Sequence, residues 1–158
     1  MVKRTFGNWI TRLLRGGQTL TDAEHRLLCL LVGQLPPHLR ETVERQFESY
    51  NLAQREIDRR ALNFYRIRLG RSGVLPVTPL LTSKLDVAPL VRISAKVEGE
   101  IEPLHVVLTA VSGRAFSVSF SRAVSERVRP EALSVGNVTQ AWKSNFVGEQ
   151  NVGLVPSA

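Results

Sequence analysis

Cysteine is almost missing from this chain, with one residue, Cys29, among 158. A single thiol excludes an internal disulfide framework and is typical of a reducing compartment. Cys29 lies in an uninterrupted apolar run, residues 27–32, where a free thiol behaves as a small hydrophobic side chain. We therefore expect Cys29 to be buried, structural and unreactive.

Long apolar runs are also missing. No stretch reaches the roughly 18 consecutive apolar residues that a membrane-spanning helix needs. Lys3 and Arg4 resemble the charged start of a signal peptide, but Arg12 and Arg15 interrupt the apolar positions that follow. These patterns predict a protein that stays in the cytoplasm.

Residues that commonly carry catalysis are scarce, since the chain has three histidines and three aspartates. It has no Gly-x-Ser-x-Gly turn and no P-loop motif. We expect His105 on the solvent face of a strand, with no nucleophile or carboxylate placed beside it. Glu98, Glu100 and Glu102 alternate around a predicted turn, where acids are usually solvated and only rarely gather a cation. We predict no metal and no cofactor, and we favour a non-catalytic protein over an enzyme.

Positive charge is concentrated in two blocks, although the net charge of the whole chain is only +7. Residues 1–18 hold four cations and no acid, and residues 55–72 hold six arginines against two acids. Arginine pairs with phosphate or carboxylate through two parallel hydrogen bonds. The second block predicts a site for an anion or a partner, with a solvated face as the alternative. The candidate site residues are Arg55, Arg59, Arg66, Arg68 and Arg71.

The first block predicts a basic amphipathic helix within residues 1–18. Apolar residues recur there at helical spacing between positions 5 and 15, with arginines on the flank. Such a helix either docks on its own domain or binds an anionic membrane or a partner groove. The residues that would make this contact are Phe6, Trp9, Arg12 and Leu13.

Two further helices are expected before the middle of the chain. Thr21 and Glu24 form a capping-box pattern at the start of the first, whose second half is apolar on all sides and predicts a central, buried helix. Pro37 suits the first turn of the next helix. Its apolar stripe runs as far as Phe64. Residues 49–51 have the lowest helix propensity in this segment, so a break in the helix would divide it in two there.

Beyond residue 70 the apolar period changes from about 3.6 to 2, which predicts half-buried strands at 91–97, 104–110 and 116–120. Their short connections require consecutive antiparallel strands. The alternation places Ile93, Val106 and Val118 in the core. Further strands are possible at 65–69 and 74–81, irregular structure is expected from residue 125, and a flexible tail at 147–158.

Together these elements predict an α+β fold, with two to three N-terminal helices packed on a curved antiparallel sheet of three to five strands. A single domain is expected to span residues 19–146. By element order alone the layout resembles the cystatin or nuclear-transport-factor type of fold, and this resemblance implies a shape and no function.

Three functions stay open at this point. The leading hypothesis is a non-catalytic protein-interaction module, which means an adaptor, an immunity-like protein or a regulatory protein. The second is a binder of an anionic ligand, a nucleic acid or a nucleotide, through the Arg-rich segment 55–71. The third is an enzyme with a pocket between the helices and the sheet.

Overall fold

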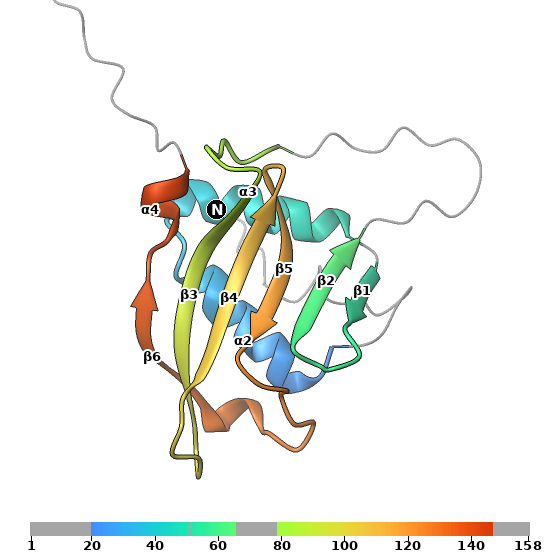
Figure 1. The fold of residues 1–158 in the computed structure, drawn as a ribbon, viewed down its shortest axis with the longest axis vertical. Coiled ribbons are helices and arrows are strands. Elements are labelled where there is room, and N and C mark those ends of the chain that lie inside the picture. The colour runs from blue at the N-terminus through green and yellow to red at the C-terminus, as the bar shows by residue number, and fades with distance from the viewer. Residues whose placement is uncertain (1–19, 51, 66–78, 147–158) are drawn as a thin grey trace, which may run out of the picture.

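The computed structural model describes residues 20–50, 52–65 and 79–146. These residues form an α+β fold, as expected, in which two helices precede an antiparallel sheet (Figure 1). The sheet has six strands, more than the three to five expected. The elements in chain order are α2 (Asp22–Gly33), α3 (Pro37–Ser49), β1 (Leu52–Arg55), β2 (Ala61–Tyr65), β3 (Val87–Val97), β4 (Leu104–Val111), β5 (Arg114–Phe120), a 3-10 turn (Pro130–Ala132), β6 (Leu133–Thr139) and α4 (Trp142–Asn145).

The strands are ordered β1-β2-β5-β4-β3-β6, and every neighbouring pair is antiparallel. The three strands read from the alternation correspond to β3, β4 and β5, and they lie at the centre of this sheet. Ile93 pairs with Val106, and Val118 pairs with Leu108. Ile93, Val106 and Val118 are at most 2% exposed, so their predicted place in the core is confirmed.

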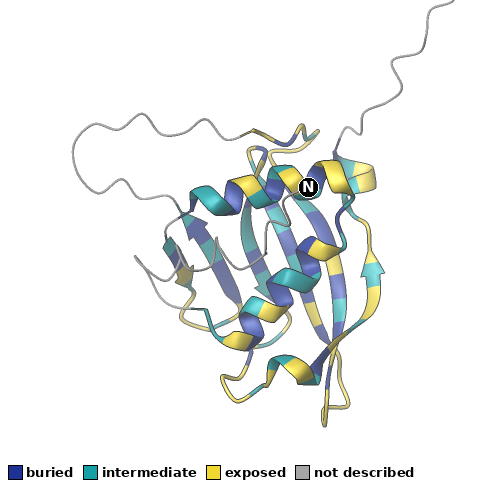
Figure 2. Cartoon of the chain, turned by 180° about the vertical axis from the view of Figure 1, so that it is seen from behind, coloured by how far each residue is buried: buried dark blue, intermediate teal, exposed yellow. Residues whose placement is uncertain are grey.

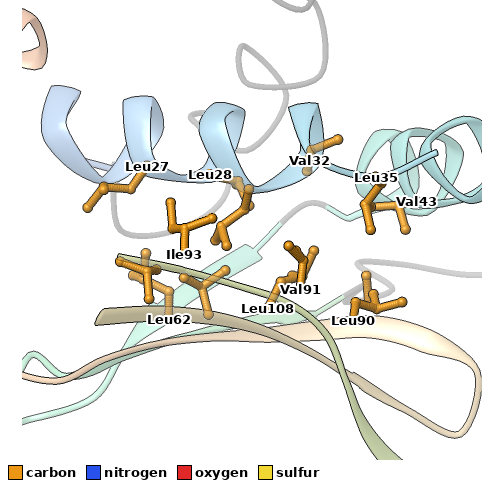
Figure 3. Close-up of a cluster of buried hydrophobic side chains, with 14 of the residues drawn as sticks. Leu27, Leu28, Val32, Leu35, Val43, Leu62, Leu90, Val91, Ile93 and Leu108 are labelled. Atoms are coloured by element: carbon orange, nitrogen blue, oxygen red, sulfur yellow. The ribbon is translucent and has the colours of Figure 1, made fainter. Parts of the chain in front are cut away.

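Both helices pack on one face of the sheet (Figure 2). The capping box is present at the start of α2, where Thr21 accepts a hydrogen bond from the Glu24 N–H and Glu24 accepts one from the Thr21 N–H. Leu27, Leu28 and other apolar side chains of α2 fill the space above Ile93 and Leu108 (Figure 3). The prediction that the second half of α2 is buried on all sides is wrong, because Cys29 and Leu30 are only half-buried.

The predicted long third helix ends at Ser49, and the chain turns into the β1–β2 hairpin. Tyr50 and Phe64 are buried, as their place in the apolar stripe suggested, but they pack from a helix terminus and from a strand. Ile57, in the same stripe, is fully exposed in the hairpin turn. The helical spacing of these residues is therefore a coincidence, because Tyr50 caps α3, Ile57 lies in a turn, and Ala61 and Phe64 lie on β2.

Residues after Ser125 are also more regular than expected. Leu133–Thr139 forms β6, which pairs with β3, and α4 follows it. The apolar alternation of β6 shifts between Val135 and Val138, where its pairing with β3 is irregular. In this stretch, a Cβ at Gly136 would lie 2.8 Å from the Ser94 carbonyl oxygen. The glycine therefore permits a close backbone approach that sequence patterning does not reveal. The predictions for residues 1–18, 66–78 and 147–158 lie outside the described residues.

Gln46 links α3 to the β4–β5 turn and is 1% exposed. Its amide nitrogen donates to the carbonyl oxygens of Pro79 (2.8 Å) and Gly113 (3.0 Å), and its amide oxygen accepts from the Ala115 N–H (2.8 Å). The Tyr50 hydroxyl donates to the Ala115 carbonyl at 2.5 Å, and burial raises the pKa of Tyr50 to about 12. These bonds satisfy buried polar groups where α3 meets β5.

Among the glycines of the described residues, Gly113 has the least room for a side chain. It has φ +76°, and a Cβ would lie 2.6 Å from the Leu81 carbonyl oxygen. We expect Gly113→Ala to lower the free energy of unfolding by about 2–3 kcal/mol, from backbone strain and overpacking together. Gly99 has φ +85° and open space around it, so Gly99→Ala should cost only about 1 kcal/mol. Chemical denaturation of both variants tests this, and equal losses would contradict the steric argument.

Candidate functional site

Arg55, the first residue of the predicted arginine site, lies on β1 and faces α2. Its guanidinium donates to Glu24 from Nε at 2.7 Å and from a terminal nitrogen at 2.5 Å. The Glu24 side chain is 1% exposed, and that of Arg55 is 15% exposed. The hydrogen bond to Glu24 is the main reason that the pKa of Arg55 is raised. Arg55 therefore joins the edge of the sheet to the first turn of α2.

Arg59 lies in the turn between β1 and β2, with the left-handed backbone value φ 60°. It donates to the Glu126 carboxylate at 2.9 Å. The helical stripe expected to run as far as Phe64 would have placed Arg55 and Arg59 on a helix, but Arg55 lies in a strand and Arg59 in a turn. Arg66, Arg68 and Arg71 lie outside the described residues, as do Phe6, Trp9, Arg12 and Leu13. Convergence of the five arginines, and the contact of the N-terminal helix, stay predictions.

A groove of about 910 Å³ lies on the face of the sheet that is turned away from α2 and α3. Ser94 and Lys96 of β3 line it, and they alternate with the buried residues Ile93, Ala95 and Val97. The β3–β4 hairpin, residues 98–103, forms one wall and projects beyond the sheet at the bottom of Figure 1. On the β6 side the lining includes Glu131, Ser134, Gly136 and Asn137.

The groove is acidic, and we call it the acidic groove. Four glutamates, Glu98, Glu100, Glu102 and Glu131, line it together with one cation, Lys96. Glu100 pairs with Arg122, which lies outside the lining. The other three glutamates have no ion-pair partner among the described residues. Their unbalanced charge favours a cationic ligand.

Arg122 holds the hairpin wall in place. Besides its bond to Glu100, it donates to the carbonyl oxygens of Pro103 (3.1 Å) and Glu102 (3.2 Å). At the tip, Ile101 is 101% exposed between Glu100 and Glu102. A fully exposed isoleucine between two acids gains nothing from folding, and it offers an apolar contact to a partner.

The acidic groove was missed because its two sides are far apart in the sequence. The alternating acids at 98–102 were visible, but they were interpreted as solvated residues. β6 was expected to be irregular, so no second side was available to form a groove. The one local signal was the absence of charge from residues 132–142, between Glu131 and Lys143.

Apolar side chains fill the layer between α2 and the sheet, where the enzyme hypothesis places a pocket (Figure 3). Within this part of the chain, no three His, Cys, Asp or Glu side chains come together as metal ligands would. None of its helices is both long and apolar enough to cross a membrane.

Comparison with known proteins finds no family model, no curated protein and no solved structure that this chain significantly resembles. The likeness of its element order to the cystatin or nuclear-transport-factor fold therefore stays a resemblance of shape. The function must be argued from the geometry of this chain.

The Glu24–Arg55 pair is largely buried. Removing one of its charges therefore leaves the other charge away from solvent and without its partner. We expect Glu24→Gln to lower the free energy of unfolding by about 3 kcal/mol. Glu41→Gln is the matched control, because the Glu41–Arg45 pair is exposed at both ends and should be worth no more than about 0.5 kcal/mol. Urea unfolding at pH 7 compares the two, and similar losses would refute a structural role for Arg55.

Cys29 lies on the half-buried side of α2, where its Sγ is 3.4 Å from Nε2 of His25. Burial raises the pKa of the Cys29 thiol to about 11 and lowers that of His25. At pH 8 the thiolate fraction should be roughly 100-fold below that of an unperturbed thiol, and alkylation should slow in proportion. Iodoacetamide labelling with and without 8 M urea measures this difference. Equal rates in the two conditions would exclude the shift.

Proposed function

We propose that this protein is a non-catalytic interaction module that binds a cationic segment of a partner protein in the acidic groove. The observation that carries the proposal is the set of three glutamates, Glu98, Glu102 and Glu131, which face an open groove without cationic partners in the described residues. Complementary charge of this kind speeds association and selects partners.

The surroundings of the groove favour a protein ligand over a small molecule. Small-molecule sites are usually enclosed and mostly apolar, whereas polar and acidic side chains dominate the lining here. Ile101 adds an exposed apolar side chain at one end. Lysine and arginine suit both features, because their stems pack on apolar surface while the charged ends reach carboxylates.

Binding of a nucleic acid or nucleotide through segment 55–71 has less support. Arg55 and Arg59 already have carboxylate partners, Glu24 and Glu126. The glutamates of the acidic groove would repel phosphate. The remaining residues named for that function, Arg66, Arg68 and Arg71, lie outside the described part of the chain.

A fluorescent seven-residue peptide of alternating lysine and valine is a direct probe of the acidic groove. Its affinity, measured by fluorescence anisotropy, should fall steeply as salt rises, because exposed ion pairs are screened. Replacing Glu98, Glu102 and Glu131 together by Gln should weaken binding roughly tenfold, since three exposed ion pairs are worth roughly 0.5 kcal/mol each.

The matched control is the triple replacement of Glu41, Glu44 and Glu48 by Gln on α3. It changes the net charge equally on a helix that packs against the opposite face of the sheet. This control should bind the peptide within about twofold of the unmodified protein. Equal weakening by both triple variants would reject the groove, as would equal affinity for a glutamate–valine peptide.

A further inference from the structure

We infer that the cationic segment binds as an extended strand, which pairs with the free edge of β6 and adds a seventh strand to the sheet. This inference rests on the proposed function and specifies how the partner is held. β6 ends the strand order and has a paired neighbour, β3, on one side only among the described residues. An edge strand of this kind presents unpaired backbone N–H and C=O groups.

The side chains of β6 do little to block such pairing. Natural edge strands are commonly protected by charges, by proline, by a β-bulge or by being very short. β6 has seven residues, and residues 132–142 contain neither a charge nor a proline. Its pairing with β3 shifts by one residue between Val135 and Val138, so the regular part of this edge is residues 133–135. The opposite edge, β1, has only four residues and leads into the charged turn at 56–60. Of the two edges, β6 is the one suited to accept a strand.

The chain itself covers the edge of β3 where β6 does not reach. α4 follows β6 and contacts β3. The Asn145 side chain donates to the Pro89 carbonyl oxygen at 3.4 Å, and Phe146 forms an isolated bridge with Ser83. In Figure 1, α4 lies above the end of β6, so the outer edge of β6 is left without a neighbouring element in the described part of the chain. In the described part of the chain, α4 covers the edge of β3, whereas the adjoining edge of β6 is open to a partner.

The hydrogen-bond pattern identifies a backbone group that faces outward. The Glu98 N–H donates to the Ala132 carbonyl oxygen at 2.9 Å, and hydrogen-bonded pairs alternate along an antiparallel ladder. Ser134, opposite Lys96, is therefore the next residue of β6 that bonds to β3. Leu133 lies between these two bonded positions and Val135 follows the second. By the same alternation, the N–H and C=O groups of Leu133 and Val135 point to the open edge.

The acidic groove borders this edge, which explains why the added strand should be cationic. Alternate side chains of a strand point to the same face of a sheet. On the groove face of an added strand, these side chains would lie beside Ser134 and Asn137, close to Glu131 and the hairpin wall. Lysine or arginine at every second position would therefore supply the charge that the groove lacks.

The same charges argue against a second copy of this chain as the occupant. Pairing of two β6 strands would bring two acidic grooves together, each with three glutamates lacking partners in the described residues. Like charges placed together across an interface are unfavourable. β6 itself carries no cation that would offset them.

N-methylated peptides test strand pairing without changing charge or side chains. In one version of the lysine–valine peptide the backbone nitrogen of every lysine is methylated. In the other version the backbone nitrogen of every valine is methylated. Because alternate N–H groups of a strand point to opposite edges, one version should lose at least tenfold in affinity. The other should stay within about threefold of the parent peptide. Each version serves as the control for the other.

Hydrogen exchange gives a second readout on the full-length protein. The parent peptide should slow exchange of the Val135 amide at least tenfold and leave that of Ser134, already bonded to β3, nearly unchanged. If the parent peptide binds but both methylated versions retain its affinity, strand pairing is wrong and the proposed function stands. No binding of the parent peptide would defeat both. Self-association through β6 that the peptide disrupts would replace the partner segment by a second copy.

Discussion

The contact between α2 and the sheet is the interaction on which the rest of the structure depends. Leu27, Leu28 and Leu31 are at most 1% exposed, and they cover the centre of the sheet at β3 and β4. Two helices can cover one face of a six-stranded sheet and leave the other to solvent. The outer face is accordingly more polar. Serine, threonine and charged side chains occupy most of the alternate positions of the central strands, together with Val107 and Val111 of β4. The acidic groove lies on that face because the helices occupy the inner one.

Polar links fix how the helical layer sits on this sheet. Gln46 connects α3 to the β4–β5 turn, and the Glu24–Arg55 pair connects α2 to β1. Each link joins segments more than 30 residues apart and is nearly dry. A misplaced helix would leave these buried groups unsatisfied, which is costly. The links therefore select one arrangement among the many that apolar contacts alone would permit.

The distribution of charge has a different meaning once the fold is known. The described residues hold 14 of the 21 cationic side chains and 13 of the 14 acidic ones, so they are close to neutral. Within them, arginines stabilise the structure: Arg55 at α2, Arg59 at Glu126 and Arg122 at the hairpin wall. The local imbalance that favours a ligand is negative, and it lies in the acidic groove. A chain with an overall positive charge thus presents an acidic site.

Four features could be predicted from the sequence. They are the α+β class, the capping box of α2, the antiparallel order of β3, β4 and β5, and the burial of Ile93, Val106 and Val118. Each depends on the spacing of residues within one segment or across a short turn. Three other features could not be predicted: the end of α3 at Ser49, the β1–β2 hairpin and β6. Short strands show only a weak alternation of apolar residues, and they gain their stability from neighbours that are distant in the sequence.

The acidic groove and the partners of Arg55 and Arg59 were decided by tertiary structure alone. Glu98 and Glu131 line one groove although 33 positions separate them, and Arg55 lies 31 positions from Glu24. Sequence periodicity reports which side of an element is buried, but it does not report which distant element covers that side. That choice is made by the packing of the whole domain, and the candidate site is one of its results.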